Sequence, residues 1–348
     1  MDNTTQPSPV SKSIGYWLLT GAVLVIAMVI LGGYTRLSHS GLSMVTWKPV
    51  TGVIPPMNEN QWQTEFQDYQ TSPEYKLRNY HFTLDEFKEI YWPEFYHRLL
   101  GRIMGLAFIV PFIYFLIRKK FNNKKIIRQL IVIFLLGLLQ GFAGWYMVAS
   151  GLVDRPAVSH YRLAIHLCLA LLLFSVLFIY AIRILKPELD KIVSFQKSVQ
   201  RIFNITLVLL VLQIIYGAFV AGLKAGLFYP TFPKMGTEWI PQTVSGAFST
   251  QGFSALTESP FVVQFIHRWL AILVTVFAVI TFIKTRREIS LVKKTGSIIF
   301  YFTLVQVVLG VITLLNLVPV SLGVIHQLMA VFLLSSLLFA VFSIRRAG

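Results

Sequence analysis

Long apolar runs separated by short polar segments dominate the pattern of hydrophobic and polar residues along the chain. Runs such as Gly15–Gly33 and Cys168–Ile182 contain no charged residue. A helix of roughly 20 apolar residues crosses the ~30 Å hydrocarbon core of a bilayer. The pattern predicts an all-α polytopic membrane protein with eight transmembrane helices, in the ranges 15–35, 93–117, 129–149, 161–183, 202–221, 261–283, 296–315 and 322–343.

Charged residues are few, and the basic ones gather in alternate connections. They make up 13% of the chain, whereas a soluble domain has about a quarter. The positive-inside rule places the basic connections and both termini in the cytoplasm, as in a multi-pass protein of the cell's inner (plasma) membrane. This topology accounts for the net charge of +16, so nucleic acid is not an expected partner. The basic residues are Arg118, Lys119, Lys120, Lys124, Lys125, Arg128, Arg183, Lys186, Lys191, Lys197, Arg201, Lys284, Arg286, Arg287, Lys293, Lys294, Arg345 and Arg346.

Short stretches of the first half recur in the second half in the same order. This order predicts two repeated four-helix bundles, related by an axis along the membrane normal. We expect one half at residues 1–190, with an outer loop at 36–92, and the other at 191–348, with an outer loop at 222–260. The recurring stretches are Glu94–Arg98 with Gln264–Arg268, Gln140 and Gly144 with Gln306 and Gly310, and Ala164–His166 with Val324–His326.

Both outer loops are long enough to suggest a functional lid or docking surface. A partly ordered surface loop is the alternative. Within the first loop, Thr83–Ile90 predicts a short interfacial helix, capped by Thr83 with Glu86 three residues later.

Four of the seven histidines lie inside predicted spans, namely His97, His166, His267 and His326. Polar side chains in lipid are costly and normally face a cavity or a partner. Each of the four lies about 6–9 Å from the outer end of its helix, at 1.5 Å rise per residue. Paired imidazoles at one depth favour axial ligation of haem iron, one pair in each half. Zinc would need a tighter cluster with carboxylate or thiolate ligands.

The two predicted haem sites lie at the same depth in the membrane. This argues against a protein that transfers electrons from one side of the membrane to the other, and it favours haem chemistry or haem storage at one face. The other three histidines, His39, His81 and His160, are interpreted as interfacial or surface residues. The single cysteine, Cys168, lies within a span and is interpreted as a small apolar residue, so no intrachain disulfide is expected.

The two halves differ three residues before the first histidine of each pair, where Glu94 in one half corresponds to Gln264 in the other. A spacing of three puts both side chains on one helix face. The difference would be explained if the half with Glu94 held a reactive site and the half with Gln264 held a structural or redox site. Glu94 would then act as a proton acceptor or stabilise positive charge. A solvated Glu94, or one paired with Arg98, is the alternative.

Three arginines near the outer ends of the helices have two interpretations. Arg98 and Arg268 directly follow histidines, and Arg36 lies just past the first span. Each guanidinium could pair with haem propionates or extend to the lipid headgroups.

Several long strings resemble the haem A synthase family, in the mitochondrial and bacterial class that lacks cysteine pairs in the outer loops. The resemblance covers nearly the whole chain. Its most specific strings are Gly32–Leu37, Ser40–Ser43, Trp47–Pro49, Gly52–Pro56, Thr83–Lys88, Glu94–Arg102 and Phe228–Met235.

The resemblance implies an oxidoreductase that converts the C8 methyl group of haem O to the formyl group of haem A. Two successive hydroxylations and loss of water would make this change. By this resemblance His97 and His166 hold the substrate haem, Glu94 is the catalytic carboxylate, and His267 and His326 bind a haem b cofactor.

Two rival functions are a di-haem b-type electron carrier and a haem transfer protein or chaperone for oxidase assembly. Equal haem depth disfavours the carrier, and Glu94 disfavours both. Haem O synthase, an electron donor and a second copy of the chain are the protein partners considered.

Overall fold

The computed structural model describes residues 11–47, 51–121, 124–152, 157–190 and 195–344. Lys48, Pro49, Lys191, Arg345 and Arg346 lie outside the described residues. Within the described ranges eight helices are long and apolar enough to cross a membrane, which confirms the all-α polytopic prediction. They are α1 (Lys12–Leu37), α3 (Leu84–Ile117), α4 (Lys124–Ala149), α5 (His160–Leu185), α6 (Lys197–Gly222), α9 (Pro260–Thr285), α10 (Ser290–Leu315) and α11 (Val320–Leu338).

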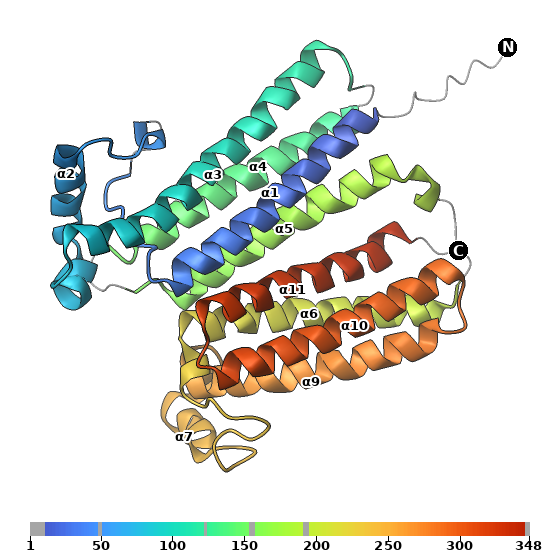
Figure 1. Cartoon of the computed structure of the whole chain (residues 1–348). Coiled ribbons are helices and arrows are strands. Elements are labelled where there is room, and N and C mark those ends of the chain that lie inside the picture. Colours follow the sequence, from blue (N-terminus) through green and yellow to red (C-terminus); the bar gives the residue numbers. More distant parts are fainter. Residues whose placement is uncertain (1–10, 48–50, 122–123, 153–156, 191–194, 345–348) are drawn as a thin grey trace.

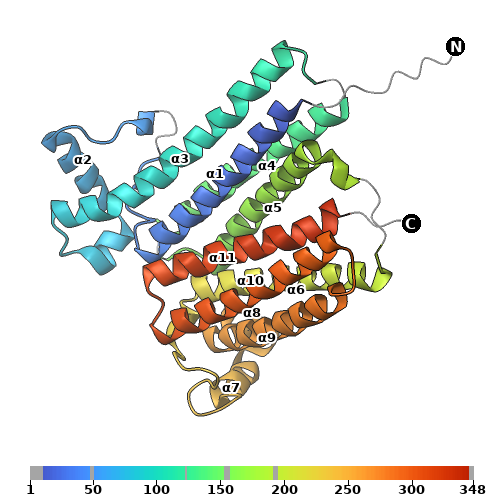
Figure 2. The same cartoon turned by 45° about the vertical axis from the view of Figure 1, so that its right-hand side comes forward.

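The eight helices form two sets of four that lie side by side (Figure 1, Figure 2). In the first set α1 packs on α3 and α5, and α4 packs on α5. In the second set α6 packs on α9, and α10 packs on both α9 and α11. The sets meet where α1 contacts α11 and where α5 contacts α6. This arrangement agrees with the predicted repeat of four-helix bundles.

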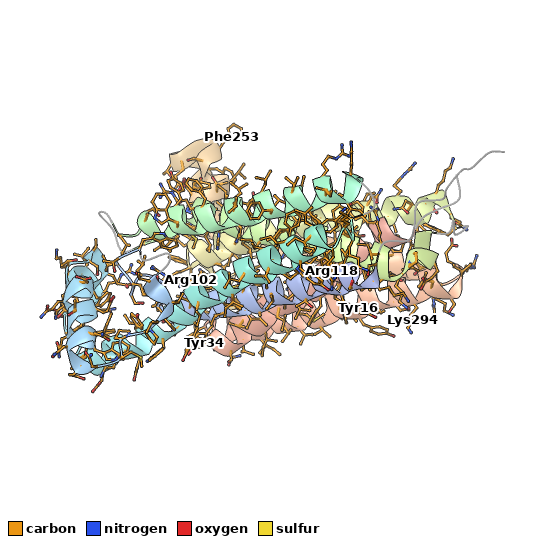
Figure 3. All side chains as sticks on the ribbon, turned by 90° about the horizontal axis from the view of Figure 1, so that it is seen from above. Tyr16, Tyr34, Arg102, Arg118, Phe253 and Lys294 are labelled. Atoms are coloured by element: carbon orange, nitrogen blue, oxygen red, sulfur yellow. The ribbon has the colours of Figure 1, made fainter. Side chains whose placement is uncertain are left out.

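Both long connections lie at the same end of the bundle, which we call the loop end (Figure 1). One carries α2 (Glu59–Gln70) and the other carries α7 (Gln242–Gln251) and α8 (Ala255–Glu258). In Figure 3, Tyr34 and Arg102 lie nearer the loop end, and Tyr16 and Lys294 lie toward the opposite end. The basic connections therefore share the end opposite to the loops.

The first connection has a small hydrophobic core of its own. Trp62, Phe66 and Tyr69 of α2 pack against Phe87 and Tyr91 at the start of α3. Aromatic side chains contribute large apolar areas when they are buried. The described parts of this loop are therefore packed against the helix that carries His97.

The predicted interfacial helix at Thr83–Ile90 is wrong as a separate element, because it is the first part of α3. The predicted cap is present. Thr83 accepts a hydrogen bond from the backbone N–H of Glu86, whose carboxylate accepts one from the backbone N–H of Thr83. The helix continues through Pro93, which has no N–H to donate. The hydroxyl of Thr35 donates to the carbonyl of Pro93 at 3.2 Å and ties this part of α3 to α1.

Candidate functional site

The four predicted histidines line one cavity of about 1490 Å³. His97 comes from α3, His166 from α5, His267 from α9 and His326 from α11. Sites for a single small ligand measure roughly 300–1,000 Å³. The cavity therefore has room for more than one large planar ligand.

Within this cavity the histidines lie in pairs, one pair in each half. His97 interacts electrostatically with His166, and His326 interacts electrostatically with His267. The structure thus brings together the partners that the repeat suggested.

Each of the four rings lies against a glycine of a neighbouring helix. A Cβ added at Gly144 would lie 2.8 Å from Cε1 of His166, and one at Gly310 would lie 2.9 Å from Cε1 of His326. A Cβ added at Gly217 would lie 3.2 Å from Cε1 of His267, and one added at Gly32 would lie 3.1 Å from Nε2 of His97. Any larger residue at these places would push the imidazole away, so the glycines fix where the rings lie.

Three of the rings also contact a glutamine placed four residues before the glycine. The distance between Nε2 of the amide and Nε2 of the imidazole is 3.3 Å from Gln140 to His166 and from Gln213 to His267. It is 3.4 Å from Gln306 to His326. The repeat predicts the correspondence of Gln140 with Gln306. Gln213 was not predicted from the sequence, although its spacing to the following glycine is the same.

Methionine replaces this glutamine in the first helix. Met28 precedes Gly32 by four residues, and its Cε would lie 3.9 Å from a Cβ added at Gly101 on α3. The thioether of Met28 therefore lies beside α3 one turn from His97, at the position in the sequence that corresponds to the glutamines. This is a second difference between the halves, besides Glu94 and Gln264.

Several polar atoms around the rings are buried without a partner among the described residues. They include Nδ1 of His166, His267 and His326, and Oε1 of the contacting glutamines. Buried polar atoms are normally hydrogen-bonded, so unpartnered ones mark where a bound group completes a site. Imidazoles that face a large, mainly apolar cavity fit axial ligation of a porphyrin iron.

Glu94 is 3% exposed and lines the same cavity. Its carboxylate accepts hydrogen bonds from the hydroxyl of Ser43 at 2.7 Å and from the backbone N–H of Met44 at 3.0 Å. It also accepts from Nε of Arg98 at 3.1 Å, so the structure contains the ion pair that the sequence analysis left as an alternative. Buried carboxylates need such partners, because desolvation of an unpaired charge is costly.

Gln264 takes the corresponding place in the second half and bonds to backbone only. Its Nε2 donates to the carbonyl of Tyr229 at 3.0 Å. Arg268 donates to the carbonyls of Tyr229 and Thr231 at 2.6 and 2.7 Å. Arg98 likewise donates to the carbonyl of Met44 at 2.8 Å. In both halves the arginine therefore ties the outer loop to the helix that carries the first histidine.

The remaining candidate residues lie in different surroundings. His81 is exposed, in agreement with its interpretation as a surface residue. His160 is buried, because its backbone and Cβ pack directly against Gly222. Its interpretation as a surface residue is therefore wrong, and the interfacial alternative stays a prediction. His39 is exposed at the loop end but lines the cavity, as does Arg36.

These features define a helical membrane protein with matched pairs of intramembrane histidines around one cavity. Residues 15–338 match the family model described as cytochrome oxidase assembly protein (COX15-CtaA). The chain belongs to this family.

Among its relatives is the protein named Heme A synthase of Wolbachia pipientis, 43% identical over 340 residues, which cover 97% of this chain and 94% of the relative. The protein of that name from Flavobacterium psychrophilum is 43% identical over 94% of this chain and 96% of its own length. That of Rickettsia felis is 42% identical over 94% and 97%.

Proposed function

We propose that this chain is a haem A synthase, an oxidoreductase that converts the C8 methyl group of haem O to a formyl group. Each of two successive hydroxylations removes two electrons, which pass to an external oxidant, and adds one oxygen atom from O2 or water. The first gives an alcohol and the second a geminal diol, which loses water to form the aldehyde. Membership of the family and the similarity to the relatives support this activity. The observation that supports the position of the active site is the buried Glu94, which lies beside one of two otherwise matched histidine pairs.

The first half is the proposed substrate site. His97 and His166 would supply the axial ligands of the substrate haem, and Glu94 lies one helical turn from His97 toward the loop end. A carboxylate held by Ser43, Met44 and Arg98 is fixed in place before substrate arrives. It would accept a proton or stabilise positive charge that develops at the porphyrin edge.

The second half is the proposed site of a resident haem b. His267 and His326 face the cavity, each against a glycine and each with a buried Nδ1 that lacks a partner in the described residues. This donor set fits a bis-imidazole haem, which would supply one-electron redox chemistry when bound. Gln213 and Gln306 would hold the imidazoles in orientation from below.

The experiment that tests the function is a haem inventory. The chain is produced together with a haem O synthase in a host that has no other haem A synthase. Haems are acid-extracted from the purified protein and separated by chromatography with mass detection. Haem A or the C8 alcohol next to haem b is expected. Haem b alone at two per chain would favour the electron carrier and refute the synthase.

The same inventory tests Glu94. Glu94→Gln copies the second half and keeps acceptors for Ser43 and Met44, so we expect haem to stay bound while haem A falls by about 10²–10⁴-fold. Glu89→Gln makes the same change at an exposed place on α3 and should have no effect. Unchanged haem A in Glu94→Gln would remove this carboxylate from the mechanism.

The haem b assignment has its own test. His267→Ala and His326→Ala should each lower haem b in the purified chain, because one axial ligand is lost. His160→Ala is a control, since this buried histidine contacts neither pair. Normal haem b content in both ligand variants would refute the cofactor site.

A further inference from the structure

We propose that Arg36, Arg78 and Lys224 form a binding site for the propionate carboxylates of the porphyrin held by His97 and His166. The identity of that porphyrin rests on the proposed function. The inference adds a carboxylate subsite to it, and it brings a residue of the second half into the substrate site of the first.

The three cations surround the loop end of the cavity. Arg36 lies four residues after Gly32, which contacts His97, so it is about 6 Å further toward the loop end. Arg78 belongs to the short helix Tyr75–Asn79 of the first outer loop, and Lys224 follows α6. All three line the cavity.

The three cations line the same cavity although they come from distant segments, and electrostatic interactions couple them. The charges of Arg78 and Arg36 act on Lys224, and all three act on His39. Partial burial and the two arginines lower the pKa of Lys224. Like charges gathered beside a cavity repel each other, and a bound anion relieves this repulsion.

None of the three cations has a side-chain hydrogen bond or an ion pair among the described residues. Arg98 and Arg268 differ in this respect, since both are engaged by carboxylate or carbonyl oxygens. The cluster therefore keeps its donors free for a ligand. Carboxylates pair with guanidinium groups through strong charge-assisted hydrogen bonds.

Glu74 is an acid close to the cluster, and it neutralises the three cations only in part. Its carboxylate is 4% exposed and interacts with the hydroxyl of Tyr69 at 3.4 Å. Burial, and then the charge of Glu94, raise the pKa of Glu74 to about 7. At neutral pH Glu74 is therefore protonated in about half of the molecules, so it offsets only part of the positive charge of Arg36, Arg78 and Lys224.

A carboxylate subsite at the loop end would also orient the reactive edge of the substrate. In haem O the C8 methyl group shares a pyrrole ring with one propionate. Propionates bound at the loop end would therefore carry this methyl to the same edge of the porphyrin. Glu94 lies toward that edge, one turn from His97. The cluster thereby restricts attack to methyl groups that neighbour a propionate.

The test compares haem b, which has free propionates, with its dimethyl ester. Full-length protein that retains its haem at the second pair is titrated with each porphyrin, and binding is followed by absorbance. The unaltered chain should prefer the free acid. Arg36→Gln and Lys224→Gln should each weaken binding of the acid by about tenfold and leave binding of the ester unchanged. Arg36→Lys should restore part of the preference.

Lys294→Gln removes an exposed cation at the opposite end and should not alter the preference. Equal binding of acid and ester by the unaltered chain would overturn the proposal. So would equal weakening for both porphyrins in the variants, which is the result of a purely structural role. Lys224 is exposed, so its variant is a test that does not endanger folding. A chain that prefers the acid but makes no haem A would refute the proposed function and leave this subsite standing.

Discussion

Single residues decide how closely the helices approach the histidine rings. Gly144 and Gly141 are near neighbours on α4, yet their surroundings differ completely. A Cβ at Gly144 would lie 2.8 Å from the ring of His166, whereas a Cβ at Gly141 meets nothing within 4 Å. The same helix therefore offers a glycine that the ring requires and one that it does not.

This contrast gives a matched pair of substitutions. Gly144→Ala should displace the ring of His166 and lower haem binding at the first pair by tenfold or more, because an axial ligand moves. Gly141→Ala should leave haem binding unchanged and stabilise the helix by up to about 1 kcal/mol. Haem content and thermal unfolding in detergent measure both effects. Equal haem content in the two variants would show that the glycine contact does not position the ligand.

Whole helices differ between the halves in how tightly they pack. α9 and α10 lie against each other along much of their length, whereas their counterparts α3 and α4 scarcely touch. Gly105 and Gly137 line the cavity between α3 and α4 with nothing near a Cβ position. Thr275 and Thr303 take these places in the second half. The first half therefore has more free space beside its histidine pair.

The free space can be reduced by copying the second half. Gly105→Thr with Gly137→Thr should lower haem A formation from haem O at least severalfold, because the added side chains occupy cavity volume. Haem b content should not change, since the second pair is untouched. Turnover at several haem O levels and the haem inventory measure the two outcomes. Normal turnover would mean that this space is not used by the substrate.

The molecule as a whole places its long loops at one end and its basic connections at the other (Figure 1). The halves are joined near the histidines, where Nε2 of Gln327 on α11 donates to the carbonyl of Val29 on α1 at 3.1 Å. The positive-inside rule predicts that the basic end faces the cytoplasm. The proposed substrate site near the loop end would then lie toward the outer leaflet.

This orientation can be tested with the single cysteine in the chain. Cys168→Ala gives a background for Phe253→Cys at the loop end, which is 89% exposed, and Lys294→Cys at the other end. In intact cells an impermeant maleimide should label the cysteine at 253 and not the one at 294. Permeabilised cells should show both. Labelling at 294 and not at 253 in intact cells would show that the chain has the opposite orientation.

The sequence by itself determined the all-α polytopic fold and its spans, and it predicted the repeat and the candidate site residues. A single apolar run of bilayer length can satisfy all its backbone hydrogen bonds within itself only as a helix, so span positions follow from local composition. The histidines and the exchange of Glu94 for Gln264 were visible because the repeat aligns them. Thr83 and Glu86 likewise predicted their cap, although not that the helix runs on through Pro93.

Only the tertiary structure decided which groups meet across distant segments. Arg36, Arg78 and Lys224 share no pattern in the sequence, and their proximity depends on how α1, α6 and the first loop come together. The burial of His160 depends on Gly222, which lies on another helix. The open contact of α3 with α4 is a property of packing as well. These contacts cannot be predicted from the sequence, because long-range contacts arise from side-chain fit and not from local periodicity.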